Sequence, residues 1–210
     1  MNPRKTLQEY FNELSSNSPT PGGGNVSALC GALSSSLGIM VCNLTIGKKK
    51  YAEVEQEMIS LKDKLDGMQK RFIELGQQDN ASFDKVMDAF KLPKETDEEK
   101  NIRSKAIEEA TIGATAAPID VIQTSKAILP ILEIIIDKGN KNSISDAGVA
   151  VALVGTAAKG AYLNVLINCS SLSNQTIANE LRKTADILVE EITRTSDRLV
   201  EQVVTAVRTK

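Results

Sequence analysis

The sequence predicts an all-α fold, a single domain over residues 1–210 built as a bundle of long helices. Apolar residues recur at helical spacing along almost the whole chain, and no alternating run indicates a strand. Short stretches that contain Pro, Gly or Ser separate these segments. The composition is 41% hydrophobic but only 3% aromatic, so we expect a core of Leu, Ile, Val and Ala.

Helices are expected, in order, over residues 3–15, 23–47, 51–91, 96–138, 144–170 and 174–208. The first is amphipathic and lacks the apolar core of a signal peptide. The second follows the breaker PTPGGG, and the fourth begins at a capping box, in which Glu99 lies three residues after Thr96. We expect the longest segments to break at Gly76 and at Pro118 or Pro130, because an interior proline removes a backbone hydrogen bond.

Helix 23–47 carries the most regular pattern, a face of small residues spaced by four and three: Gly24, Ala28, Gly31, Ser35, Gly38 and Cys42. Such a face lets another helix approach closely, so we expect it to be buried in the middle of a tight bundle or a homodimer. Because the stretch from Val26 to Ile46 is nearly uncharged, a membrane span is the alternative. Three consecutive serines, an asparagine and a threonine in this stretch argue against the span.

Charge and composition exclude several classes of function. The net charge is −2, with both signs mixed throughout, which disfavours a nucleic-acid partner. The chain contains no histidine, which removes His-based acid–base catalysis, His–Cys zinc sites and Ser-His-Asp triads. The cysteines, Cys30, Cys42 and Cys169, form no C-x-x-C pair and are expected to be buried, reduced thiols of a cytoplasmic protein.

Helix 51–91 contains one carboxylate within an apolar stripe. Asp79 interrupts a series that steps by three and four residues, Phe72, Leu75, Phe83, Val86 and Phe90. A carboxylate on a buried face needs a partner, and burial raises its pKa toward the range that suits a general acid or base. The pattern alone leaves two interpretations for Asp79, a buried salt-bridge partner or a functional acid or base.

Helix 144–170 places two amides, Asn164 and Asn168, on a face of small residues. Because unpaired buried amides are costly, these side chains either bond neighbouring helices or recognise the polar ring of a ligand. Asp146, near the start of the same helix, fits a capping box with Ser143 and is the second candidate acid.

The stretch SPTPGGGNVSAL, residues 18–29, joins a Pro-Gly breaker to the start of a helix. It has neither the preceding strand nor the G-K-[ST] ending of a phosphate loop. The backbone N–H groups at this helix start still favour a carboxylate or the polar edge of a ligand.

Three collinear regions resemble the cyclodeaminase/cyclohydrolase family: SPTPGGGNVSAL with GALSSSLGIMV and TIGKKKY, then DNASFDKVMDAFKLPKETDEEK, then GNKNSISDAGVAV with AAKGAYLNVLIN. The resemblance covers almost the whole chain. It implies an all-helical homodimer that acts on a tetrahydrofolate one-carbon unit, with no metal and no cofactor besides the folate substrate. The family's proton-donating acid falls on Asp79. The chain departs from the family at Asn25, where we expect Ser, and at Gln78, where an acidic neighbour is common.

The activity that the resemblance implies is that of a methenyltetrahydrofolate cyclohydrolase. A formiminotetrahydrofolate cyclodeaminase is the alternative, and a non-catalytic folate-binding or scaffold protein is the second alternative. One carboxylate suits either reaction, because hydrolysis of the cationic methenyl bridge needs a base for water and an acid for the leaving nitrogen.

The same resemblance suggests how the folate is held. Pro21 and the three glycines that follow it, Gly22, Gly23 and Gly24, are expected to turn the chain and bring backbone N–H groups to the folate. The lysine cluster, defined as Lys48, Lys49 and Lys50, is expected to bind the anionic glutamate tail. A solvated charge run at a helix end is the other interpretation of these lysines.

Overall fold

The computed structural model describes residues 5–209, and within them it confirms the all-helical prediction, since no strand occurs in this part of the chain. In chain order the helices are α1 (Leu7–Leu14), α2 (Gly23–Thr45), the 3₁₀ helix η1 (Lys49–Val54), α3 (Glu55–Phe90), α4 (Asp97–Ala114), α5 (Ala116–Lys138), the 3₁₀ helix η2 (Lys141–Ser143), α6 (Ile144–Ser170) and α7 (Gln175–Arg208).

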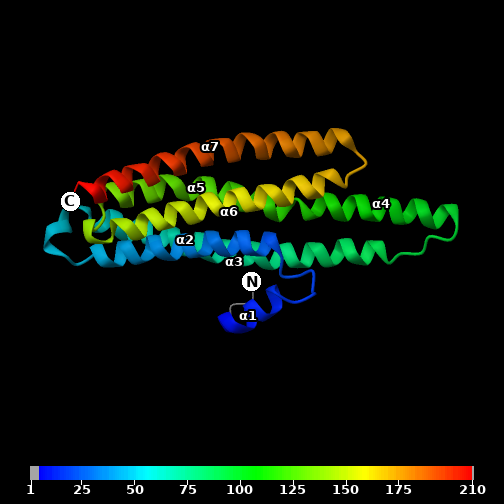
Figure 1. Cartoon of the computed structure of the whole chain (residues 1–210), viewed down its shortest axis with the longest axis horizontal. Coiled ribbons are helices and arrows are strands. Elements are labelled where there is room, and N and C mark those ends of the chain that lie inside the picture. The colour runs from blue at the N-terminus through cyan, green and yellow to red at the C-terminus, as the bar shows by residue number, and fades with distance from the viewer. Residues whose placement is uncertain (1–4, 210) are drawn as a thin grey trace.

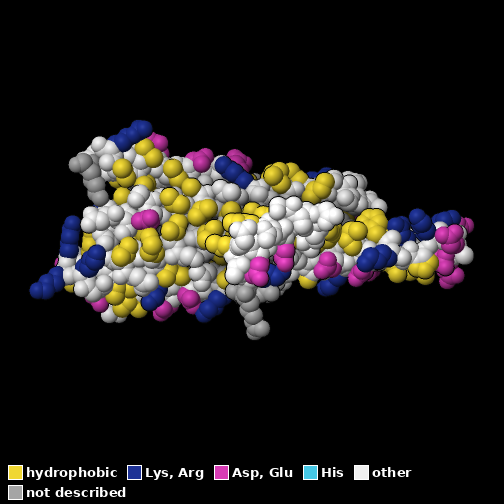
Figure 2. All heavy atoms as spheres, turned by 60° about the horizontal axis from the view of Figure 1, so that its bottom comes forward, with side chains coloured by type: hydrophobic (Ala, Val, Ile, Leu, Met, Phe, Trp, Pro, Cys, Tyr) yellow, Lys and Arg dark blue, Asp and Glu magenta, His cyan; other side chains and the backbone are white. Residues whose placement is uncertain are grey.

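The long helices run along one axis of the molecule (Figure 1). α2 packs between α3 and α6, α5 lies against α3 and α6, and α7 covers α5 and α6. The end of α3 and most of α4 extend beyond the other helices as a hairpin, whose tip is covered with charged side chains of both signs (Figure 2). α1 lies outside the bundle, below α2 and α3 in Figure 1. The start of α2 lies beside the base of this hairpin, where α3 and α4 leave the bundle.

The small-residue face of α2 is buried, as predicted, and it packs inside this chain. Gly31 and Gly38 explain why small residues are needed there. A Cβ atom at Gly31 would lie 2.4 Å from the ring of Phe72, and one at Gly38 would lie 2.8 Å from Leu65 Cδ1. Both of these α3 side chains are fully buried. The expected aliphatic core is also present, with Phe72 as its one aromatic side chain among the largest fully buried residues.

The expected helix 96–138 is two helices, because the chain breaks at Thr115. Pro118 has no N–H for the carbonyl of Ala114, and that carbonyl instead accepts a hydrogen bond from Asn168 Nδ2 at 3.0 Å. The break therefore lies beside Pro118, the first of the two prolines at which it was expected, and the break expected at Gly76 is wrong. Pro130 lies inside α5 between core residues, and Gly76 lies buried inside α3.

Capping was predicted correctly at one of two positions. Thr96 and Glu99 form the expected capping box at α4, and a second box at Thr6 and Glu9 starts α1. The box expected at Ser143 and Asp146 is absent, because α6 continues directly from η2. Asn140 caps that 3₁₀ turn instead, with its Oδ1 accepting from the N–H of Asn142 at 3.1 Å.

Two helical segments, Gly23–Thr45 and Lys141–Ser170, are long and apolar enough to cross a membrane by length and composition. Within the bundle, 56% and 44% of their most apolar windows are buried against other helices. These helices build the centre of the core, which is a sufficient reason for their composition. The free thiols Cys42 and Cys169 are buried as expected, whereas Cys30 is only half-buried.

Candidate active site

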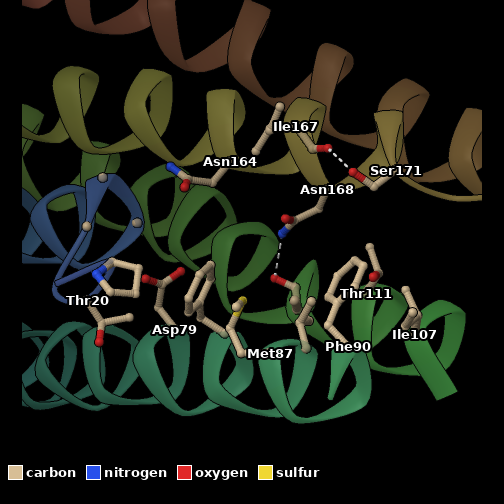
Figure 3. A pocket seen from close by; sticks show the side chains of 17 residues that line it. Thr20, Asp79, Met87, Phe90, Ile107, Thr111, Asn164, Ile167, Asn168 and Ser171 are labelled. Carbon is tan, nitrogen blue, oxygen red and sulfur yellow. Dashed lines mark hydrogen bonds between the residues drawn. The ribbon is translucent and has the colours of Figure 1, made fainter. Parts of the chain in front are cut away.

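A cavity of about 360 Å³ lies at the start of α2, between α3, α4 and α6 (Figure 3). This volume is within the range of about 300–1,000 Å³ that is typical of small-molecule pockets. The described residues that line it come from the loop before α2 and from these helices: Pro19, Thr20, Gly22, Gly23, Gly24, Asp79, Phe83, Val86, Met87, Phe90, Ile107, Thr111, Ala114, Asn164, Ile167, Asn168 and Ser171.

Asp79 is the only charged side chain among the described lining residues. It is half-buried on α3, and Phe83, Val86 and Phe90 extend the wall away from it along the same helix. Burial raises the pKa of Asp79, and a hydrogen bond from the backbone N–H of Asn25 opposes this rise. No salt-bridge partner faces Asp79 among residues 5–209, so the site holds a single carboxyl group suited to acid–base chemistry.

The glycines at the start of α2 allow the backbone to meet this carboxyl group. A Cβ atom at Gly24 would lie 2.1 Å from Asp79 Oδ1, so only glycine fits the observed geometry there. The first N–H groups of a helix have no partner within the helix and carry partial positive charge. The glycines therefore let the start of α2 approach Asp79 closely, and the carboxyl group accepts a hydrogen bond from the backbone N–H of Asn25, the residue after Gly24. Pro21 is buried behind this turn and does not line the cavity.

Asn164 and Asn168 both line the cavity, and the amide nitrogen of each donates a hydrogen bond to a backbone carbonyl. Asn164 Nδ2 donates to the Gly160 carbonyl at 2.9 Å, and Asn168 Nδ2 donates to the Ala114 carbonyl at 3.0 Å. No described residue donates a hydrogen bond to the Oδ1 atom of either side chain. The Asn168 nitrogen thus bonds a neighbouring helix, α4, whereas the Asn164 nitrogen bonds only its own helix, α6. The oxygens of both side chains stay available to a ligand.

The lysine cluster and Asp146 do not line this cavity. α2 has 23 residues, which at 1.5 Å per residue separates its ends by about 35 Å. The lysine cluster follows the far end of α2 and is exposed. Asp146 lies in the first turn of α6, whereas the cavity is at the last turns of that helix. Within one chain, Asp79, the glycines 22–24, Asn164 and Asn168 therefore line one cavity. The lysine cluster and Asp146 lie away from it.

One wall of the cavity was missed by reasoning from the sequence. It consists of Ile107, Thr111 and Ala114 on α4, with Pro19 and Thr20 from the loop. The α4 residues are spaced by four and three, so they could have been found as a stripe. Their placement beside Asp79, however, depends on how α4 folds back along α3. Among residues 5–209, no group of three or more His, Cys, Asp or Glu side chains could hold a metal ion.

Comparisons with known proteins show what the chain is similar to. Residues 6–187 match the family model described as formiminotransferase-cyclodeaminase. The chain is 41% identical over 187 residues to a methenyltetrahydrofolate cyclohydrolase of Methylorubrum extorquens, covering 89% of this chain and 90% of the relative. It is 30% identical to the formimidoyltransferase-cyclodeaminase of Rattus norvegicus, of which it spans 34%. The crystal structure of formiminotetrahydrofolate cyclodeaminase from Thermotoga maritima superposes with a TM-score of 0.80 at 30% identity, covering 96% of this chain and 98% of that one.

Proposed function

Because the chain belongs to the formiminotransferase-cyclodeaminase family, we propose that it is an enzyme of tetrahydrofolate one-carbon metabolism, a methenyltetrahydrofolate cyclohydrolase. The reaction converts 5,10-methenyltetrahydrofolate and water into 10-formyltetrahydrofolate. The relative from Methylorubrum extorquens supports this choice, since the two chains match over nearly their whole lengths. The observation that carries the proposal is the single half-buried carboxyl group of Asp79 in a cavity with otherwise uncharged walls.

The chemistry needs two proton transfers at one carbon atom. The methenyl bridge is a cationic amidine, and its carbon is electrophilic. Ionised Asp79 would take a proton from water as the new C–O bond forms. The same carboxyl group would then give a proton to the ring nitrogen as the C–N bond breaks. The hydroxyl group of the adduct would lose its proton to solvent as the formyl C=O bond forms, which balances the positive charge of the substrate. The apolar walls beside Asp79 would favour this cycle, because they strengthen the attraction between its carboxylate and the cationic substrate.

The uncharged part of the cavity fits the rest of a folate. Phe83, Val86 and Phe90 offer an apolar wall to a flat ring system. The unpaired Oδ1 atoms of Asn164 and Asn168 would accept hydrogen bonds from the amino and N–H groups of the pterin edge. The role of the backbone N–H groups at the start of α2 would be to hold the carboxylate of Asp79 rather than a phosphate group.

A formiminotetrahydrofolate cyclodeaminase is the second candidate, favoured by the close superposition on the enzyme from Thermotoga maritima. Two assays on the purified protein separate the candidates. Loss of methenyl absorbance, faster than in buffer alone, would support the cyclohydrolase. Release of ammonia from formiminotetrahydrofolate without loss of methenyl absorbance would support the cyclodeaminase. A protein that binds folate and accelerates neither reaction would be a binding protein, and the proposal would fail.

Two copies of the chain, in this proposal, associate through the outer face of α2. On this face Leu33, Leu37, Met40 and Leu44 follow heptad spacing, and three of them are 36–46% exposed. Hydrophobic side chains are open to solvent on the side of the bundle seen in Figure 2. An apolar stripe of this kind favours packing against a second helix. With α2 antiparallel to its copy about a two-fold axis at Leu37, the end of one α2 would lie over the start of the other.

This arrangement gives the lysine cluster a function that a single chain does not offer. Gly24 lies 13 residues before Leu37 and Lys50 lies 13 residues after it. The lysine cluster of one copy would therefore lie beside the cavity of the other. The described lining residues include no lysine or arginine, so the cluster of the second copy would supply the positive charge for the glutamate tail.

Mixing two inactive or weakened variants tests the arrangement. We expect Lys48→Ala/Lys49→Ala/Lys50→Ala to raise KM more than it lowers kcat, and the effect to shrink with added salt. Mixed with Asp79→Asn, this variant would form heterodimers in which one site is complete, so activity at low substrate would rise above that of either variant. A monomeric solution mass, or mixtures with no gain in activity, would contradict the proposal.

We further propose a cytoplasmic location, with no nucleic-acid or membrane partner. The mixed charges, and the burial of large parts of both apolar helices inside the bundle, support this proposal. Cell fractionation would test it, and recovery of the protein in washed membranes would contradict it.

A further inference from the structure

A buried hydrogen-bond network lies directly behind Asp79, and it begins in α1. Tyr10 is the one buried residue of α1 and is 5% exposed. Its hydroxyl group donates to Asn25 Oδ1 at 3.0 Å. Asn25, which is fully buried in the first turn of α2, donates through Nδ2 to the Gly76 carbonyl at 2.7 Å and to Asn80 Oδ1 at 3.2 Å.

The acceptors of Asn25 flank Asp79 in the sequence of α3. Gly76 lies three residues before Asp79, and Asn80 is the next residue. The Asn25 amide therefore fixes the turn of α3 that carries the carboxyl group. The backbone N–H of the same residue donates to Asp79 directly. One residue of α2 thus holds both the backbone that supports Asp79 and the carboxyl group itself.

Tyr10 completes the hydrogen bonding of Asn25. Both donors of the Asn25 amide are used by α3, and the Tyr10 hydroxyl supplies the one donor that its oxygen receives among the described residues. Without that hydroxyl, a fully buried amide oxygen would have no partner, which favours rearrangement of the side chain. Such a rearrangement would move the N–H groups and carbonyl contacts that determine the position of Asp79.

We propose that Tyr10 and Asn25 are positioning residues for Asp79, and that α1 contributes to the active site through these two residues. The inference rests on the proposed function only where turnover is the readout. α1 leads directly into the loop that supplies Pro19 and Thr20 to the cavity. Docking of α1 through Tyr10 therefore fixes two parts of the site together.

Kinetics of Tyr10→Phe provide the first test, because the variant keeps the ring and removes only the hydroxyl. A misplacement of about 1 Å can cost about a hundredfold in rate, so we expect kcat to fall by roughly ten- to a hundredfold while KM stays within about twofold. The matched control is Tyr162→Phe. It removes a hydroxyl that bonds Asp186 at 2.5 Å, away from the cavity lining, and should leave kcat unchanged.

A double-mutant cycle distinguishes positioning from a separate structural role. In Asn25→Ala the Tyr10 hydroxyl no longer has its partner, so adding Tyr10→Phe should lower kcat no further. Independent, multiplicative losses in the double variant would overturn the proposal.

A readout that does not use turnover keeps the test independent of the proposed reaction. The Asn25 N–H is at a helix start, and its protection from hydrogen exchange comes from Asp79. Its exchange should be faster by several fold in Tyr10→Phe, as measured by NMR, and unchanged in Tyr162→Phe. Unchanged exchange in Tyr10→Phe would refute the coupling even if the enzyme is active. Faster exchange in a protein with no folate turnover would refute the proposed function alone.

Discussion

Replacing Gly24 with alanine perturbs the position of Asp79 through one methyl group. The added Cβ atom would lie 2.1 Å from Oδ1, 2.5 Å from Cγ and 2.7 Å from Oδ2 of Asp79, whereas ordinary contacts begin near 3.4 Å. The carboxyl group must therefore move away from α2, by about 1 Å, and an error of this size costs about a hundredfold in rate. We expect kcat to fall by about that factor.

The adjacent glycine provides the matched control. A Cβ atom at Gly23 would lie 3.6 Å from Asn164 Nδ2, which is an ordinary contact. Gly23→Ala introduces the same methyl group one residue earlier and is expected to keep a rate near that of the wild type. Loss of methenyl absorbance measured at saturating substrate compares the variants, and circular dichroism verifies that each is folded. Equal rates for Gly24→Ala and Gly23→Ala would refute the placement of Asp79 against α2.

Four further outcomes are expected. Gly31→Ala drives a methyl group into the buried ring of Phe72 and should destabilise by about 1–3 kcal/mol. Gly67→Ala, with no atom within 4 Å of its Cβ, should stabilise by up to about 1 kcal/mol; similar melting temperatures would contradict the packing. Burial makes the pKa of Asp79 higher in the folded protein than in the unfolded chain. The free energy of unfolding therefore falls as the pH rises from the pKa of Asp79 in the unfolded chain to its pKa in the folded protein. Asp79→Asn should therefore melt above the wild type at neutral pH, and this difference should vanish below about pH 4. The acid limb of the wild-type pH profile of kcat/KM, which reports the enzyme without substrate, should lie above the ordinary Asp pKa, and a limb at or below it would contradict a base in this environment.

Much of the fold could be predicted from the sequence, because it depends on local periodicity. The small-residue face of α2 and the apolar stripe around Asp79 repeat at helical spacing, and such patterns are readable without knowing their partners. The break at Thr115 was harder to predict. Pro118 lies where the i→i−4 bond is lost, but the bond that compensates for it comes to the Ala114 carbonyl from Asn168, which is 54 residues after Ala114. Pro130 lies in a core helix that remains continuous.

The candidate site could be predicted only in part, for the same reason. Asp79 stands out because a carboxylate interrupts an apolar stripe, and Gly24 because glycines cluster at a helix start. The contact between Asp79 and Gly24 depends on how α2 packs against α3, which no local sequence pattern predicts. Tyr10 and Asn25 were not connected by reasoning from the sequence, because their hydrogen bond joins two helices across a turn. The distance of the lysine cluster from the cavity follows from the length of α2.

Turnover of methenyltetrahydrofolate by Asp79→Asn tests the central claim most directly. The variant preserves the shape of the side chain and removes only its titrating proton, and Asp146→Asn, which alters a carboxylate outside the cavity, is the control. A general acid–base step contributes about 10²–10⁴-fold. We therefore expect kcat to fall within that range in Asp79→Asn while folate binding, measured by calorimetry, is retained, and to remain at the wild-type value in Asp146→Asn. A folded Asp79→Asn protein that binds folate and turns it over near the wild-type rate would contradict the claim.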